Sequence, residues 1–281
     1  MDVRSLTGKT ALITGASSGI GRATALACAK RGARLALCDL DAEGLAETER
    51  LVRALGGERR VLAQRVDVAD AEQMRAFAEA VHREAPAVDL LVNNAGVGLG
   101  GGFLDTSLED WRWIVDINLL GVVHGCHFFV PAMVARGAGG HVVNVASAAG
   151  YLPSELLSAY TTTKYAVLGL SESLHLELHR RGIGVSAICP GIVNTAITRT
   201  SPMRGVAAQP GARERMIAGY QRRNYGSERV AENILRAVQR GRVVAPITLE
   251  AWAAYYAKRA APWLVRALGR WQARVGIPDL A

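Results

Sequence analysis

The amino-acid sequence predicts an α/β protein built on a doubly wound parallel sheet of about seven strands, with helices on both faces. Short β-branched or apolar runs alternate with longer amphipathic stretches along the 281 residues. Half of the residues are hydrophobic, which is ample for a buried core and excludes a disordered chain. No repeat or low-complexity segment interrupts this alternation, and no break in composition separates two domains before residue 248. We therefore expect successive right-handed βαβ units.

The expected strands are Thr10–Thr14, Arg34–Cys38, Val61–Val66, Val88–Val92, His141–Ala146, Val185–Cys189 and Val243–Ile247. Helices are expected near residues 20–31, 42–55, 70–84, 107–135, 154–180 and 227–240. Parallel strands joined by helices are covered on both faces. Residues 191–226 are an exception, because they are rich in Pro, Gly and Arg and have only a weak helical pattern. Loops of that length are usually functional, so we expect a lid there.

The composition indicates a cytoplasmic protein. The first nine residues hold no apolar run, so we expect no secretory signal. The most apolar stretch, residues 114–135, contains Asp116, His124 and Pro131 among other polar or helix-breaking residues, which favours a buried helix over a membrane span. The four cysteines lie far apart without a Cys-x-x-Cys pair, so a disulfide scaffold or a zinc ribbon is not expected.

The net charge of +8 is unevenly distributed. Residues 1–198 hold 18 basic and 20 acidic side chains, whereas residues 199–281 hold 15 basic and 5 acidic ones. A nucleic-acid binder with a uniformly basic surface is therefore not expected. A solvated basic surface on the last third of the chain is the simpler interpretation.

A glycine-rich turn joins the first expected strand to the first expected helix, in the order Thr14-Gly15-Ala16-Ser17-Ser18-Gly19-Ile20-Gly21. Glycines permit a tight turn and a close approach of the backbone to a ligand. The start of a helix offers free N–H groups and a partial positive charge to a pyrophosphate. A plain loop remains the alternative, but the strand before and the helix after favour a nucleotide site. The expected contacts are Gly15, Ser17, Ser18, Gly19, Ile20 and Gly21.

Polar residues close the next three expected strands, where open α/β sheets bind ligands. Asp39, followed by Leu40, lies 20 residues beyond Gly19. A carboxylate there accepts hydrogen bonds from an adenosine ribose and repels the 2′-phosphate of NADP, so NAD is the expected cofactor. Arg22 and the overall positive charge are the features that favour NADP instead. The same position also suits an ordinary surface-turn aspartate.

The third and fourth strands end in further candidate contacts. Asp67 and Val68 could bracket an adenine. Asn94, Ala95 and Gly96 offer small side chains and an amide against which a cofactor can pack.

A candidate catalytic group follows the fifth strand. Ser147 comes directly after it, and Tyr160 and Lys164, four residues apart, share one face of the next helix. A tyrosine with an ordinary pKa of about 10 is a poor base near neutrality. A neighbouring ammonium and a cationic nicotinamide favour tyrosinate and lower that pKa. Ser147 could then hold the oxygen of a substrate.

Together these motifs resemble the short-chain dehydrogenase/reductase family, in its order and spacing, across about residues 8–247. The matching residues are Thr14-Gly15-x-x-x-Gly19-x-Gly21, Asp39, Asp67, Asn93-Asn94-Ala95-Gly96, Asn118, Ser147, Tyr160-x-x-x-Lys164 and Pro190-Gly191-x-Val193-x-Thr195. The resemblance implies a Rossmann-type sheet and hydride transfer between NAD(H) and an alcohol or carbonyl group. It also implies a homo-oligomer, a tetramer or a dimer, built on the helices that carry Asn118 and Tyr160.

The resemblance further implies a role for each residue. Tyr160 would be the general acid/base, and Lys164 would bind the nicotinamide ribose and tune Tyr160. Ser147 would orient the substrate, and Asn118 would hold a water in a proton relay. The nicotinamide-side contacts would be Pro190, Gly191, Val193 and Thr195. Two alternatives stay open: an NADP-dependent carbonyl or oxoacyl reductase, and a cofactor-binding protein without turnover.

We expect residues 1–247 to form the dinucleotide-binding and catalytic domain and residues 248–281 a helical extension. The uncharged segment 148–152 favours a hydrophobic alcohol or ketone as substrate. His175 and His179 are four apart, but no metal site is expected, because the order is not that of a zinc motif.

The extension is aromatic and basic. An apolar stripe of Leu264, Leu268, Trp271 and Val275 accompanies a stripe of Arg266, Arg270 and Arg274. Such a helix suits either packing on the protein or a partner subunit, or peripheral contact with an anionic membrane.

Overall fold

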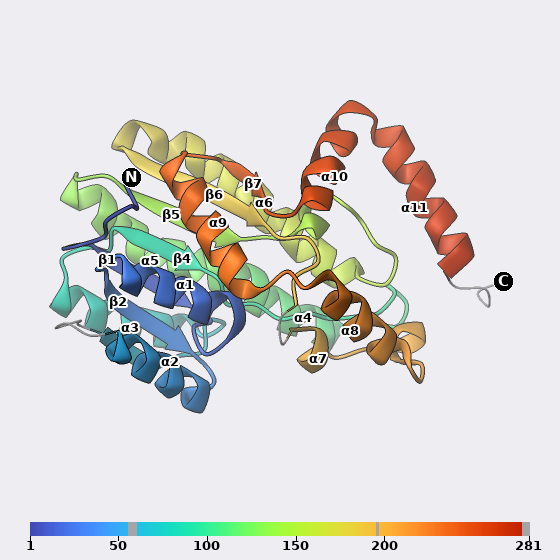
Figure 1. The fold of residues 1–281 in the computed structure, drawn as a ribbon, viewed down its shortest axis with the longest axis horizontal. Coiled ribbons are helices and arrows are strands. Elements are labelled where there is room, and N and C mark those ends of the chain that lie inside the picture. The colour runs from blue at the N-terminus through green and yellow to red at the C-terminus, as the bar shows by residue number, and fades with distance from the viewer. Residues whose placement is uncertain (56–60, 195–196, 277–281) are drawn as a thin grey trace.

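The computed structural model describes residues 1–55, 61–194 and 197–276, and its core is one parallel sheet (Figure 1). The described strands run in the order β3-β2-β1-β4-β5-β6-β7. They span β1 (Thr10–Thr14), β2 (Arg34–Asp39), β3 (Val61–Arg65), β4 (Leu90–Asn93), β5 (Gly140–Val145), β6 (Ile183–Cys189) and β7 (Val244–Pro246). The order reverses between β1 and β4, which is the switch point of a Rossmann-type sheet. All seven predicted strands are confirmed.

Helices cover both faces of the sheet, as predicted. One face carries α1 (Gly19–Lys30), α2 (Ala42–Ala54) and α9 (Ser227–Gln239). The other carries α3 (Ala71–Glu84), α5 (Gly121–Arg136) and α6 (Ser158–Leu178). Each set buries its apolar side against one face of the strands and forms a separate hydrophobic core. The sheet is therefore covered on both faces. A polar ligand can reach it at the ends of the strands.

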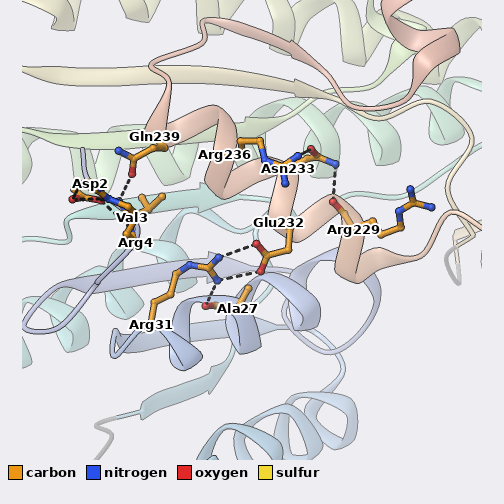
Figure 2. A network of polar contacts seen from close by, with 10 residues as sticks. All are labelled: Asp2, Val3, Arg4, Ala27, Arg31, Arg229, Glu232, Asn233, Arg236 and Gln239. Atoms are coloured by element: carbon orange, nitrogen blue, oxygen red, sulfur yellow. Dashed lines mark hydrogen bonds and ion pairs between the residues drawn. The ribbon is translucent and has the colours of Figure 1, made fainter.

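Helices α1 and α9 are close in space although they are far apart in sequence. Arg31, just after α1, donates to the carbonyl oxygen of Ala27 at 2.9 Å and pairs with Glu232 of α9 at 2.8 Å (Figure 2). Gln239, at the end of α9, accepts a 2.7 Å hydrogen bond from the amide of Val3 (Figure 2). These contacts fix the ends of two helices that cover the same side of the sheet.

The predicted helix 107–135 is present but interrupted. It consists of α4 (Leu108–Val115), a π-helical turn at Asp116–Leu120, and α5. The combined segment Leu108–Arg136 is long and apolar enough to cross a membrane by length and composition. However, Phe129 and Met133 are fully buried in the core beside α3, in keeping with the expected buried helix.

The segment after β6 differs from the expectation of an irregular loop. It contains α7 (Ile197–Thr200) and the twelve-residue helix α8 (Ala212–Arg223). The expectation was wrong for α8 because that helix lies on the surface and has no strong apolar stripe, which is the signal that reveals a helix in a sequence. The tail forms two helices, α10 (Leu249–Ala260) and α11 (Pro262–Gly276), with α11 at one end of the molecule (Figure 1).

Candidate active site

The glycine-rich turn is shaped so that only glycine fits at key positions. Gly15 and Gly19 have φ angles of +64° and +52°, which other residues rarely adopt. A Cβ atom on Gly15 would lie 2.7 Å from the Cα of Ala95, and one on Gly21 would overlap the carbonyl oxygen of Gly15. The turn therefore lies directly against the segment that follows β4. Within the described part of the chain, no side chain caps the start of α1, so its first N–H groups can serve a phosphate.

Side chains from β1 and the segment after β4 lock these two loops together. The amide nitrogen of the Asn94 side chain donates to the carbonyl oxygens of Thr14 at 2.9 Å and Gly15 at 3.0 Å. The hydroxyl of Thr14 accepts hydrogen bonds from the backbone amides of Asn94 and Ala95, both at 3.0 Å. Asn94 was predicted as a cofactor contact, and its NH₂ group is used to hold the turn in shape.

Asp39 lies beside the glycine-rich turn at the end of β2, as predicted. Its carboxylate accepts a 2.8 Å hydrogen bond from the amide of Ser17 and a 3.0 Å bond from the amide of Asp41. Arg22, the residue that favoured NADP, is half-buried between α1 and α2. Its guanidinium donates to the carbonyl oxygens of Ser17 and Gly44 and to the hydroxyl of Thr48. The Arg22 guanidinium is therefore engaged in hydrogen bonds within the protein.

The remaining predicted cofactor contacts lie at the same edge of the sheet. Leu40 is exposed just after β2, and Asp67 and Val68 follow β3. The carboxylate of Asp67 accepts a 2.9 Å hydrogen bond from the amide of Ala69, which shapes that turn. Pro190, Gly191 and the buried Val193 follow β6. The predicted contact Thr195 lies outside the described residues.

Asn118 is buried in the π-helical turn, where an extra backbone residue changes the direction of a helix. Its side chain pairs with the backbone of Val97, accepting from the amide at 2.8 Å and donating to the carbonyl oxygen at 2.9 Å. It also donates to the hydroxyl of Thr163 on α6 at 3.3 Å. Asn118 thereby joins the segment after β4 to the helix that carries Tyr160.

Lys164 points from α6 into the same buried region. Its Nζ donates a 2.9 Å hydrogen bond to the carbonyl oxygen of Val145 and lies 5.7 Å from the centre of the Tyr160 ring. A Cβ atom on Gly96 would lie 3.5 Å from this Nζ and 3.1 Å from Oδ1 of Asn118. Burial lowers the pKa of Lys164 to about 8, because a charge is costly away from water.

Ser147 begins the segment that follows β5. Its hydroxyl accepts a 3.2 Å hydrogen bond from the amide of Ala149, and the amide of Ala148 donates to the carbonyl oxygen of Pro190 at 2.8 Å. The segments after β5 and β6 therefore lie side by side. Cys189, just before Pro190, is fully buried, and burial raises its pKa to about 12, so it stays a neutral thiol.

A family model described as short chain dehydrogenase matches residues 9–204. The chain belongs to the short-chain dehydrogenase family. The family is one of oxidoreductases, and the match includes the glycine-rich turn, Ser147, Tyr160 and Lys164 but ends before α8, α9 and the tail.

Curated relatives of the chain are bacterial oxidoreductases. The probable oxidoreductase EphD of Mycobacterium tuberculosis is 41% identical over 266 residues, which cover 92% of this chain but 44% of that protein. The chain thus spans less than half the length of that relative. The putative oxidoreductase SadH of the same organism is 37% identical over 88% of both chains. A cyclohexanol dehydrogenase of Acinetobacter sp. is 37% identical over 67% of this chain and 74% of that protein.

Solved structures of family members share the fold. A short-chain dehydrogenase/reductase of Burkholderia phymatum in complex with NAD has a TM-score of 0.82 and is 34% identical, covering 94% of this chain and 96% of that one. Levodione reductase has a TM-score of 0.79 and is 29% identical, covering 88% of this chain and 99% of that one.

Helix α10, which lies outside the matched residues, contacts the segment after β5 and the loop after β6. The sequence analysis did not predict these contacts. Tyr151 donates a 2.8 Å hydrogen bond to the carbonyl oxygen of Ala251, and its ring centre lies 5.5 Å from that of Tyr255. Glu250 accepts a 3.3 Å hydrogen bond from the amide of Ile192 and forms an ion pair with Arg223 of α8. Glu250 thus joins the loop after β6, the helix α8 and the tail. A single acidic residue without a motif gives no signal of this role in a sequence.

The segment that contains α7 is attached to α4 and to the loop after β4. Arg204 forms a two-pronged ion pair with Asp110 of α4, with N–O distances of 2.8 and 2.9 Å. Its backbone amide donates to the carbonyl oxygen of Gly100 at 2.8 Å, and Met203 forms a β-bridge with Gly100. Among the described residues, these contacts attach the segment to α4 and to the loop after β4.

Proposed function

We propose that the chain transfers a hydride between NAD(H) and an alcohol or carbonyl substrate, with Tyr160 as general acid/base. The observation that carries this proposal is the buried ammonium of Lys164 beside the Tyr160 ring, next to Asn118 and Gly96. A buried lysine charge is costly to a fold, and such groups concentrate at functional sites. The family to which the chain belongs gives that cluster its chemical meaning.

The described residues fit a dinucleotide. The glycine-rich turn packs so closely against the segment after β4 that Cβ atoms at Gly15 or Gly21 would clash with protein atoms, and it leads into the start of α1, whose N-cap Ser18 makes no side-chain cap. When bound, NAD supplies the carbon that accepts or gives the hydride. The proposed contacts are Gly15, Ser17, Ser18, Gly19, Ile20, Gly21, Asp39, Leu40, Asp67, Val68, Asn94, Ala95, Gly96, Tyr160, Lys164, Pro190, Gly191, Val193 and Thr195.

In the proposed mechanism the phenolic oxygen of Tyr160 removes the hydroxyl proton during alcohol oxidation and returns it during carbonyl reduction. The charge of Lys164 favours the tyrosinate that accepts this proton. The hydroxyl of Ser147 donates a hydrogen bond to the substrate oxygen and holds it near Tyr160. Asn118, fixed by the backbone of Val97, holds a water that passes the proton on toward solvent.

NAD rather than NADP is the proposed cofactor. The carboxylate of Asp39 lies beside the turn and repels a 2′-phosphate, while the guanidinium of Arg22 is engaged between α1 and α2. An NADP-dependent carbonyl or oxoacyl reductase is the second candidate. The exposed Arg65 favours it, because its Nε lies 3.2 Å from the carbonyl oxygen of Leu40, on the rim of the same site.

The proposed substrate is hydrophobic. The Tyr160 ring packs on an apolar cluster that includes Leu99, Ile114 and Trp113. Ala148 and Leu152, after Ser147, likewise pack against the core. Apolar surroundings of this kind favour a hydrophobic alcohol or ketone. The similarity to a cyclohexanol dehydrogenase supports the same class.

The test is a panel of apolar secondary alcohols and ketones assayed with each of the four nicotinamide cofactors. We expect turnover with NAD or NADH and apolar substrates, and weaker turnover with NADP or NADPH. A chain that binds NADH but turns over no member of the panel would instead favour a cofactor-binding protein without activity of its own.

We also propose a homo-oligomer, a tetramer or dimer, built on the helices that carry Asn118 and Tyr160. Leu120, Tyr165 and Leu176 leave apolar surface exposed along this side of the chain. The domain division remains residues 1–247 for the cofactor and the chemistry and 248–281 for the extension, in a cytoplasmic protein. Sedimentation as a monomer alone at micromolar concentration would contradict the oligomer.

A further inference from the structure

Helix α11 extends from the rest of the molecule. Figure 1 shows it at the end of α10, on the side of the molecule where α7 and α8 also lie. Among the described residues its main packing partner is α10. Trp263 and Leu264, at its start, have 65% and 40% of their surface exposed. The two adjacent residues leave apolar surface exposed at the start of α11.

The charge along α11 has one sign only. Residues Pro262–Gly276 hold three arginines, Arg266, Arg270 and Arg274, and no Asp or Glu. Arg266 and Arg270 lie four residues apart, on one face of the helix, and both are exposed. Exposed apolar residues beside arginines are typical of helices that lie in the headgroup region of a bilayer.

We propose that α11 is an interfacial helix that docks the protein on an anionic lipid surface. Charge complementarity favours this occupant over α11 of a second copy of the chain. Pairing of α11 with itself across a two-fold axis would bring arginines against arginines, because both partners present the same surface. Phosphate headgroups attract the arginine charge, and the exposed Trp263 suits the boundary between headgroups and acyl chains.

Docking through α11 would also orient the rest of the molecule, because α10 connects α11 to α8 and to the loop after β6. Helix α10 joins α11 to Glu250, which pairs with Arg223 of α8 and accepts from the amide of Ile192. A protein held by α11 would therefore present the α8 side of its site near the lipid surface. The docking itself does not depend on the proposed reaction, since it requires only α11.

The experiment is co-sedimentation of the full chain with vesicles of phosphatidylcholine alone and of phosphatidylcholine with phosphatidylglycerol. We expect binding to the anionic vesicles, none to phosphatidylcholine alone, and release in high salt. The double variant R266Q/R270Q should bind about 30-fold more weakly, the loss expected for two basic side chains at an anionic surface. The variant W263S should also bind more weakly at every salt concentration.

The matched control is R236Q/R240Q, which removes the same charge from two exposed positions, one on α9 and one just after its end (Figure 2 shows Arg236). It should bind anionic vesicles like the unaltered chain. Equal binding by R266Q/R270Q and the control would overturn the proposal, as would absence of binding at low salt. A change of sedimentation coefficient in W263S without a change in vesicle binding would assign α11 to a second copy instead. NADH binding by every variant is measured in parallel. If NADH binding is unaltered, a loss of vesicle binding is a property of α11 and is independent of whether the proposed function holds.

Discussion

The Nζ of Lys164 lies 5.7 Å from the centre of the Tyr160 ring while donating a hydrogen bond to the carbonyl oxygen of Val145. Both side chains leave the same face of α6, one turn apart. Lys164 is buried and Tyr160 is half-buried, so little water lies between them to screen the effect of the lysine charge on the tyrosine. This arrangement has a stability cost that can be measured separately from activity.

We expect Lys164→Met to stabilise the protein at pH 7. Burial lowers the pKa of Lys164 from 10.5 to about 8, so charging this group opposes folding below pH 8. Between pH 8 and 10.5 the unfolded chain binds the extra proton, and the unfolding free energy of the unaltered protein rises relative to that of the variant. Loss of the bond to Val145 offsets part of the gain, which leaves about 2 kcal/mol at pH 7. Urea unfolding of both proteins at several pH values measures the difference.

The control is Lys30→Met, which removes an exposed lysine at the end of α1. Its unfolding free energy should follow that of the unaltered protein at every pH. If the Lys164→Met variant also ran parallel to the unaltered protein between pH 8 and 10.5, Lys164 would not have a lowered pKa.

Asp39 is expected to set the choice of cofactor. The change Asp39→Asn keeps an oxygen to accept from the amide of Ser17 but removes the negative charge. We expect the preference for NADH over NADPH, measured as the ratio of dissociation constants, to fall by roughly tenfold or more. The measurement is titration of protein fluorescence with each cofactor.

Glu43→Gln is the matched control for charge, because Glu43 is an exposed acid in the first turn of α2. It should leave the preference unchanged. An unaltered protein that binds NADPH as tightly as NADH would assign the cofactor choice to Arg65 and the NADP-dependent candidate.

Glu250 is expected to position the loop after β6. In Glu250→Gln the ion pair with Arg223 is lost and the bond from the amide of Ile192 is weakened. We expect KM for NAD to rise about two- to fivefold, the range of a partly exposed ion pair, with a smaller change in kcat. Steady-state kinetics at saturating substrate measure both.

Two further variants separate positioning from general destabilisation. Glu228→Gln, on the exposed first turn of α9, should leave KM unchanged. The charge exchange R223E/E250R should restore part of the affinity for NAD. A rise in KM that the exchange does not reverse would show that the charge pair is not what holds the loop.

The main elements could be predicted because each leaves a strong local pattern. The strands are short apolar runs, and Asp39 and Ser147 follow such runs directly. The π-helical turn at Asn118 could not be predicted, since an extra backbone residue inside a helix changes no periodicity that a short window detects. Helix α8 escaped prediction because it is a surface helix without an apolar stripe.

The contacts of the tail depend on tertiary structure alone. The bond from Tyr151 to Ala251 joins residues 100 positions apart, and nothing in either local sequence marks it. The same holds for Glu250 and Ile192, which are 58 residues apart. The aromatic and basic composition of the tail predicted a helical extension, but it did not predict which part of the site α10 supports.

The most direct test of the account is the change Tyr160→Phe, because it removes one hydroxyl and leaves the ring beside Lys164. With NAD and an apolar secondary alcohol, we expect kcat to fall by at least about 100-fold while the dissociation constant for NADH stays within about twofold. Tyr165→Phe, on the same helix and exposed, is the control and should keep full activity. Activity in Tyr160→Phe equal to that of Tyr165→Phe would contradict the assignment of Tyr160 as the general acid/base.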